Sequence, residues 1–174
     1  MRYIIVSVVK NNAGNFNNNL RKDIFEKFGA KSSKLPAHFT IKSPFESGNI
    51  KELEDVLYEF SKINTSKYYK IKDYDNFDDR VIFMKILMSN EGQTLHDKLI
   101  DALSTVSYIN FNNDDGKNKI FHVTISSKKI QKIFTNLLEY ISHIPCEFDC
   151  SFDNICIYKW QDNTWKLHKE YLLN

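Results

Sequence analysis

The sequence contains the pattern His-x-Thr-Ile twice, beginning at His38 and at His122. A histidine can accept or donate a proton near neutral pH, because the ordinary pKa of imidazole is about 6.5. Two histidines can therefore supply the general base and the general acid of one displacement reaction. The hydroxyls of Thr40 and Thr124 can donate hydrogen bonds to oxygens on which negative charge develops. We predict that the two histidines are catalytic and that the two threonines bind a phosphate, in a scheme that requires no metal ion or other cofactor.

Both copies of the pattern have the composition of β-strands. They are rich in β-branched and aromatic residues, and Pro36 and Pro44 lie on either side of the first copy, which disfavours a helix. In a strand, residues two positions apart point to the same face. The histidine and the threonine of each copy are therefore expected to face a cleft. The residues that alternate with them are expected to face the core: Phe39, Ile41, Val123 and Ile125.

The same alternation places Lys42 and Ser126 at the next cleft-facing position, provided that both strands continue. Lys42 could steer a phosphate there, although a lysine exposed at a strand end is the commoner arrangement. We treat both residues as auxiliary to the site. The other histidines, His96, His143 and His168, lie in no comparable pattern, and we predict structural or surface positions for them.

Length and composition indicate a globular protein. The 174 residues are 42% apolar and 14% aromatic, which is enough for one domain with a sizeable core. We predict that residues 1–174 form a single domain of two lobes, each contributing one His-x-Thr motif. The formal net charge of +2 excludes the strong basic field of a non-specific binder of duplex DNA, but it is compatible with a partner that carries a few phosphates.

The apolar run from Tyr3 to Val9 is too short for a membrane span or a signal peptide. We therefore expect a cytoplasmic protein that does not contact a membrane. Its three cysteines do not make a disulfide framework and fit a reducing compartment. A zinc site built from His143 and the cysteines is disfavoured, because alternation puts Cys146 and Cys150 on the apolar face of a strand.

The rest of the chain is predicted to alternate between strands and helices. A buried strand covers Tyr3 to Val9, and a helix that begins at a cap on Asn17 or Asn18 ends at Gly29. Apolar spacing predicts further helices around residues 50–63, 95–106 and 130–141, and further strands at residues 68–77, 81–88, 146–152 and 165–173.

Two stretches lack this regularity. Asn110 to Lys119 has the composition of an exposed loop, and Ile155 to Tyr158, after Asn154, suggests a bulge or turn. Each motif strand is followed by an amphipathic helix and then by strands, which indicates an internal duplication. No Gly-x-Gly-x-x-Gly or P-loop motif is present. These patterns favour an α+β fold with lobes around a shared cleft over a parallel nucleotide-binding sheet.

A pair of His-x-Thr motifs on strands in the two halves of such a chain resembles the 2H phosphoesterase superfamily. This superfamily includes the bacterial RNA 2',3'-cyclic phosphodiesterases, also called 2'-5' RNA ligases. The resemblance covers nearly the whole chain, and residues 36–45 are similar to the family's first motif. It implies two pseudo-symmetric lobes of antiparallel sheet with flanking helices around a central cleft, and it places the four motif residues in the groove.

The resemblance also implies a reaction. A 2',3'-cyclic phosphate at an RNA 3' end or on a nucleotide would be hydrolysed to a 2'-phosphate, and the reverse step would be 2'-5' ligation. In-line displacement needs the base and the acid on opposite sides of phosphorus, and the sequence leaves open which histidine has which role. Two alternatives use the same cleft: a non-catalytic protein that binds a nucleotide or RNA end, and an enzyme for a small nucleotide-derived cyclic phosphate. We expect a monomer.

Overall fold

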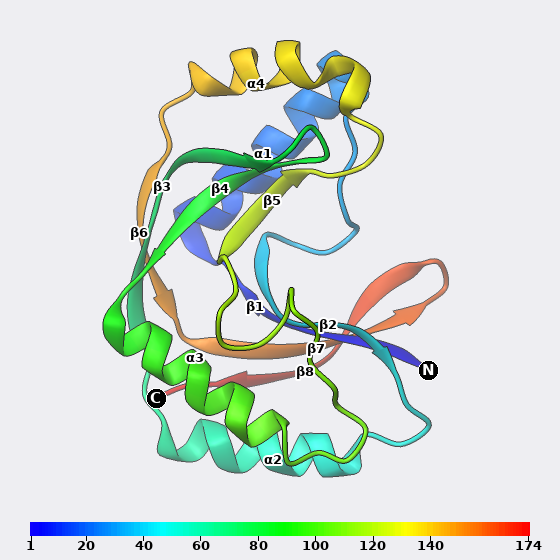
Figure 1. Ribbon diagram of the computed structural model, residues 1–174, viewed down its shortest axis with the longest axis vertical. Coiled ribbons are helices and arrows are strands. Elements are labelled where there is room, and N and C mark those ends of the chain that lie inside the picture. The colour runs from blue at the N-terminus through cyan, green and yellow to red at the C-terminus, as the bar shows by residue number, and fades with distance from the viewer.

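The computed structural model describes residues 1–174 and contains eight β-strands and four α-helices, which confirms the α+β class (Figure 1). None of the helices combines the length and the apolar character that crossing a membrane requires. In chain order the elements are β1 (Arg2–Val8), α1 (Asn11–Phe28), β2 (His38–Glu46), α2 (Lys51–Ile63), β3 (Lys67–Phe77), β4 (Val81–Met88), α3 (Asn90–Leu103), β5 (His122–Ser126), a 3-10 turn (Gln131–Ile133), α4 (Phe134–Ser142), β6 (Glu147–Phe152), β7 (Asn154–Gln161) and β8 (Thr164–Leu172).

The strands form two antiparallel sheets of four strands, ordered β2-β1-β7-β8 and β5-β4-β3-β6. In Figure 1 they lie between two pairs of helices, α1 with α4 at the top and α2 with α3 at the bottom. The sheets are not the two halves of the chain, because the first sheet takes the first two strands and the last two. The two motif strands, β2 and β5, are each the edge strand of a sheet, and they contact each other.

The main core is one cluster of 37 buried residues drawn from both sheets and from the helices. Phe39 of β2 is fully buried and packs edge-on against Tyr69, Phe121 and Phe152, with ring centroids 5.1 to 5.8 Å apart. Such edge-to-face contacts stabilise a core beyond the area that they bury. Because Phe39 lies between the histidine and the threonine of the first motif, this packing fixes the strand that carries them.

Helix α1 begins at Asn11, well before the cap predicted at Asn17 or its neighbour. The polar composition of this stretch gives no helix signal, and tertiary packing overrides it. Gly14 is buried against the end of β1, where a Cβ would lie 2.2 Å from the carbonyl oxygen of Val9, so only glycine allows this approach. The helix ends as predicted at Gly29, which is in the left-handed region at φ 66°.

The stretch expected to be a bulge or turn, Ile155 to Tyr158, forms half of β7, an inner strand of the first sheet. Asn154 interrupts the alternation because it is buried where the chain crosses between the sheets. Its side chain accepts a hydrogen bond from the Val8 N–H at 2.8 Å and donates to the Val8 carbonyl at 2.9 Å. The pairing with β8 shifts register between Ile157 and Tyr158, so the expected irregularity is present within the strand, whereas a turn is not. Continuous apolar runs of this kind are typical of buried strands, which give no period-two signal.

Two apolar residues at the ends of the predicted helices 50–63 and 95–106 do not lie on a buried helix face. Ile63, the last residue of α2, is 81% exposed, and Val106 is buried but lies beyond the end of α3 at Leu103. Helix ends are therefore where the apolar spacing was least accurate, since the periodic signal continues past the last hydrogen-bonded turn.

His96 lies in the core, whereas His143 and His168 are on the surface, as predicted. The His96 ring is fully buried against Phe121, with centroids 4.7 Å apart, and neither of its nitrogens has a hydrogen-bond partner. Burial, aided by the charge of Lys119, lowers the pKa of His96 from 6.5 to about 4. The folded protein therefore holds this ring neutral.

We expect His96→Leu to raise the free energy of unfolding by about 1 kcal/mol at pH 7, because the two unsatisfied nitrogens are removed. As pH falls from about 6.5 to 4, His96 binds a proton in the unfolded chain but stays neutral in the folded protein. The free energy of unfolding therefore decreases over this pH range. Between pH 7 and pH 5 the variant should lose less free energy of unfolding than the parent protein, and urea unfolding at the two pH values would measure the difference. The surface variant His143→Leu is the control. A pH dependence in His96→Leu as steep as in the parent protein would contradict the expectation.

Candidate active site

The two motif histidines are held in the same way. The Nδ1 atom of His38 donates to the carbonyl oxygen of Pro36 at 2.7 Å, and that of His122 donates to the carbonyl oxygen of Ile120 at 2.9 Å. Because a carbonyl oxygen can only accept, each Nδ1 must carry the proton. The Nε2 atom of each ring is then the one that remains to take up or give a proton.

Burial follows the alternation that the sequence predicts in both motif strands. Thr40 and Thr124 are half-buried like the histidines, whereas the residues between them are fully buried. The main-chain oxygens of the two threonines are occupied: Thr40 accepts from the Lys119 ammonium, and Thr124 accepts from the amide of Asn17 at 3.3 Å. Both contacts are made to the main chain and do not involve the two hydroxyls.

Lys42 and Ser126 do not lie where the alternation predicts them. The Lys42 side chain is only 4% exposed and forms an ion pair with Asp115 at 2.6 Å, so the expectation of an exposed lysine is wrong. Ser126 is fully buried, and its hydroxyl donates to the carbonyl oxygen of Lys31 at 2.7 Å. Both side chains are therefore engaged within the protein.

One cause explains both departures. In the β1–β2 pair, Val6 lies opposite Thr40 but Ile5 lies opposite Lys42, so Ile41 is passed over. The β4–β5 pair passes over Ile125 in the same way, since Phe83 opposes Thr124 and Ile82 opposes Ser126. Passing over one residue is the pattern of a β-bulge, which reverses the faces of the residues that follow. Each motif therefore ends in an equivalent irregularity directly after its threonine.

The loop predicted to be an exposed connector contributes two charges to the interior. Asp115 is buried against Lys42, and Lys119 reaches back to the Thr40 carbonyl, three residues before His122. Burial lowers the pKa of the Lys119 ammonium from 10.5 to about 8, with Asp115 opposing the shift and Lys42 adding to it. Sequence patterns did not reveal Lys119 as a site residue, and its position beside the second motif is the only local signal that could have found it.

The surroundings also lower the pKa of both histidines. Burial is the largest cause at His38 and is only partly opposed by the bond to Pro36; the charges of Arg21, His122 and Lys119 lower the pKa further, to about 4. At His122, burial and then the charge of Lys119 lower the pKa. At pH 7 both rings are thus neutral in the free protein, and they lie among cations that favour an anionic ligand.

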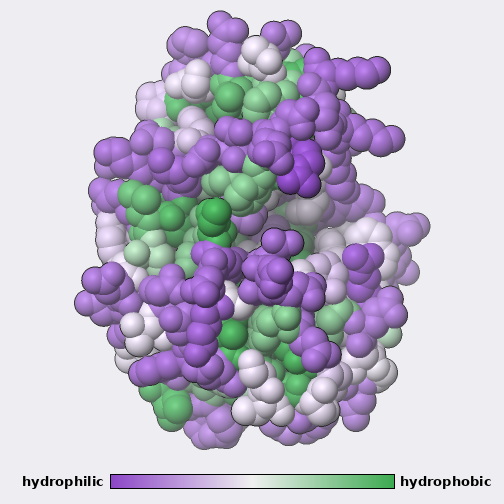
Figure 2. All heavy atoms as spheres, in the orientation of Figure 1, coloured by the Kyte–Doolittle hydropathy of each residue, from purple (hydrophilic) through white to green (hydrophobic).

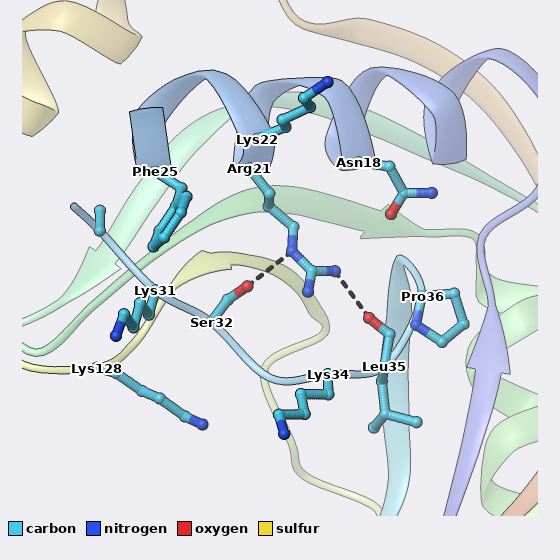
Figure 3. A pocket seen from close by; sticks show the side chains of 11 residues that line it. Asn18, Arg21, Lys22, Phe25, Lys31, Ser32, Lys34, Leu35, Pro36 and Lys128 are labelled. Atoms are coloured by element: carbon cyan, nitrogen blue, oxygen red, sulfur yellow. Dashed lines mark hydrogen bonds between the residues drawn. The ribbon is translucent and has the colours of Figure 1, made fainter. Parts of the chain in front are cut away.

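Arg21 of α1 is a second residue that the sequence did not reveal. Its guanidinium donates to the Ser32 hydroxyl at 2.7 Å, to the Leu35 carbonyl at 2.9 Å and to the Ser33 carbonyl. Figure 3 shows the bonds to Ser32 and Leu35, which tie α1 to the segment that leads into β2. Because this segment ends next to Pro36, Arg21 holds the chain that orients the His38 ring.

Two pockets lie near the motif strands. The pocket of about 560 Å³ beside the second motif is lined by His122, Lys119, Phe77 and the turn between β3 and β4. The pocket of about 610 Å³ beside the first motif lies between α1 and residues 30–36 and includes Pro36. The larger pocket therefore borders the histidines without including them.

The structure brings no three His, Cys, Asp or Glu side chains together in a group that could hold a metal ion. All three cysteines are free thiols; Cys146 and Cys156 are buried and Cys150 is half-buried. Burial raises the pKa of each thiol, to about 11 for Cys146 and Cys150 and to about 12 for Cys156. These cysteines behave as buried apolar groups, as the alternation of the strand predicted for the first two.

Comparison with known proteins shows a family match in sequence and a shared fold. The sequence model of the 2'-5' RNA ligase superfamily matches residues 15–164, which is most of the chain. No curated protein matches the sequence.

Several solved structures share the fold. TT0787 of Thermus thermophilus superposes with a TM-score of 0.68 at 10% identity, over 99% of this chain and 98% of that one. LigT of E. coli in its apo form gives 0.64 at 12% identity over 99% and 97% of the two chains. The structure of E. coli LigT complexed with 3'-AMP gives 0.59 at 12% identity over 99% and 98%. The fold that the resemblance implied is thereby confirmed.

Proposed function

This chain belongs to the 2'-5' RNA ligase superfamily, the 2H phosphoesterases, and from that premise we propose that it is a metal-independent cyclic phosphodiesterase. Its substrate would be a 2',3'-cyclic phosphate at an RNA or oligonucleotide 3' end, which it opens to a 2'-phosphate. The observation that carries the proposal is the matched pair of bonds to Pro36 and Ile120, which leave the Nε2 atoms of both histidines available. Each motif strand thus offers one group that can transfer a proton.

The proposed reaction is an in-line displacement by water. One imidazole removes a proton from the attacking water as the new phosphorus–oxygen bond forms, the bond from phosphorus to the 3'-oxygen breaks, and the other imidazolium protonates that oxygen. The products are a 2'-phosphate and a 3'-hydroxyl. If the 5'-hydroxyl of a second RNA takes the place of water, the same displacement forms a 2'-5' phosphodiester, which is the ligation. The hydroxyls of Thr40 and Thr124 donate to the non-bridging oxygens as their charge increases.

We assign His38 as the base and His122 as the acid. The charges of Arg21 and Lys119 lower the pKa of His38, so that its ring is neutral and can accept a proton. Among these cations only Lys119 acts on His122. A bound phosphodiester carries a negative charge, which raises the pKa of a nearby imidazole and restores the proton that His122 must donate. The different charges around the two rings therefore support an assignment that pseudo-symmetry left open.

The proposed ligand agrees with what is known of a protein that shares the fold, since LigT of E. coli has been crystallised with the nucleotide 3'-AMP. The site needs only one chain, because both motif strands come from the same molecule, and we propose that the protein acts as a monomer. Three free thiols fit a reducing compartment, and we propose a cytoplasmic location.

The test is turnover of 2',3'-cyclic nucleotides and of short RNAs that end in a cyclic phosphate, with and without a chelator. Chromatography should show a 2'-phosphate product in both conditions. Binding without turnover from pH 4 to pH 9 would overturn the proposal in favour of a non-catalytic nucleotide-binding protein. Turnover that stops in the chelator would contradict the metal-independent mechanism.

The pH dependence of kcat/KM is expected to be bell-shaped, with its maximum on the acidic side of neutrality. The free enzyme must have His38 neutral, which requires a pH above about 4, and His122 protonated, which requires a pH below the lowered pKa of that ring. The maximum should therefore lie between pH 4 and 6.5. Steady-state rates across this range would measure it.

The variant Lys119→Gln tests whether the charge of Lys119 sets the position of this pH profile. Removing the Lys119 charge raises the pKa of both imidazoles, so the bell should move to higher pH. A profile that moves to lower pH, or a parent enzyme with its maximum above pH 7, would contradict the proposed electrostatics.

A further inference from the structure

The larger pocket carries an excess of positive charge. Five of the residues that line it are basic and none is acidic: Arg21, Lys22, Lys31, Lys34 and Lys128. None of these five forms a salt bridge. The whole chain has a formal net charge of only +2, so this pocket, which we call the basic pocket, is a local concentration of charge. Concave, single-sign surfaces of this kind attract polyanions.

The basic pocket borders both motifs. At one end it includes Pro36, which holds the His38 ring, and two residues of chain span at most about 7 Å. On the other side Lys31 forms an isolated β-bridge with Lys128, which follows β5. In Figure 2 hydrophilic side chains project at the upper right, where Figure 1 shows the segments after α1 and after β5. The charge therefore lies at the margin of the site, next to the residue that holds the His38 ring.

The basic side chains of the pocket differ in how free they are to bind a ligand. The Arg21 guanidinium is occupied by the segment before β2, and Figure 3 shows Lys22 on the opposite side of α1, pointing away from the other lysines. Lys34 and Lys128 extend toward one region of the pocket from different segments in the same view. The ammonium of Lys34 makes one hydrogen bond, to the Asn163 carbonyl at 2.6 Å, which leaves two donors.

An exposed aromatic ring completes the surface. Phe25 of α1 lines the pocket, is 51% exposed, and has the Lys31 ammonium 6.0 Å from its ring centre. A solvent-exposed ring beside unpaired cations is the combination that proteins use to hold single-stranded nucleic acid, with the ring stacking on a base and the cations contacting the backbone. A mononucleotide would occupy the motif residues alone and leave this surface unused.

We propose that the basic pocket binds the phosphodiester backbone on the 5' side of the terminal cyclic phosphate, so that this protein prefers an RNA oligonucleotide to a 2',3'-cyclic mononucleotide. Lys31, Lys34 and Lys128 contact the phosphates, and Phe25 stacks on a base. Arg21 positions the segment that carries two of these lysines. This inference rests on the proposed function and names the surface that selects an oligonucleotide over a mononucleotide at the same site.

The test compares two substrates that share a terminal nucleotide: a 2',3'-cyclic mononucleotide and a ten-residue RNA that ends in the same cyclic phosphate. In the triple variant Lys31→Gln, Lys34→Gln, Lys128→Gln, the ratio of kcat/KM for the RNA to that for the mononucleotide should fall by about 10- to 100-fold. The slope of log kcat/KM for the RNA against log salt should become shallower by about 2, since a contact to single-stranded phosphate contributes about 0.7. Far-UV circular dichroism would establish that the variant is folded.

The control replaces three lysines that do not line the basic pocket, Lys51→Gln, Lys62→Gln and Lys72→Gln, which are 68%, 52% and 46% exposed. It removes the same total charge and should leave the ratio unchanged. An unchanged ratio in the pocket variant, or an equal fall in the control, would overturn the inference while the proposed function stands. No turnover of either substrate by the parent protein would overturn the proposed function itself.

Discussion

Replacing either motif histidine by alanine is expected to lower kcat by about 10²- to 10⁴-fold, the usual contribution of a positioned general acid or base. His38→Ala removes the group that takes the proton from water, and His122→Ala removes the group that protonates the 3'-oxygen. Both rings are held through Nδ1 and present Nε2, so the loss should be of the same order on the two sides. Single-turnover rates with a cyclic phosphate substrate would measure it.

The two losses should differ in one respect. A phosphodiester with a nitrophenolate leaving group needs no proton at the departing oxygen, so it is expected to restore turnover in His122→Ala but not in His38→Ala. The surface histidine variant His143→Ala is the control and should retain parent rates. Full activity in both single variants would exclude paired-histidine catalysis.

The second large effect is on stability. Asp115→Ala is expected to lower the free energy of unfolding by about 3–5 kcal/mol, because it leaves the Lys42 ammonium buried without its partner. The two side chains are 4% and 3% exposed and lie 2.6 Å apart, and Asp115 also accepts from the N–H and the hydroxyl of Ser43. Burial alone would raise the pKa of Asp115, but the hydrogen bonds from Lys42 and Ser43 outweigh it and hold the pKa below 3.8. The ion pair therefore stabilises the folded protein at neutral pH, and this stabilisation is lost as pH falls below about 4.

Urea unfolding would measure this loss against an exposed pair. Lys51 and Asp55 are 68% and 60% exposed, so Asp55→Ala should cost less than about 1 kcal/mol. The double variant Lys42→Met, Asp115→Leu removes both charges and should recover most of the stability. If Asp115→Ala were as mild as Asp55→Ala, the pair would not anchor the loop that carries Lys119.

Much of the fold follows from local patterns. Most of the predicted strands and helices lie where apolar spacing put them, and Gly29 ends α1 as expected. The failures have long-range causes. Asn154 and β7 are explained by the crossing between two sheets, and the early start of α1 is explained by the close approach of Gly14 to Val9, neither of which leaves a periodic signal.

The sequence by itself determined the four motif residues, His38, Thr40, His122 and Thr124, and the face on which each lies, because side-chain direction in a strand is a local property with a period of two. Only the tertiary structure decided where that alternation stops. Neighbouring strands impose the register shifts after each threonine that turn the next side chain inward, and the folded chain brings Arg21 and Lys119 to the histidines. Burial and charge act through space, so they set the proton affinity of each imidazole in a way that no spacing of residues encodes.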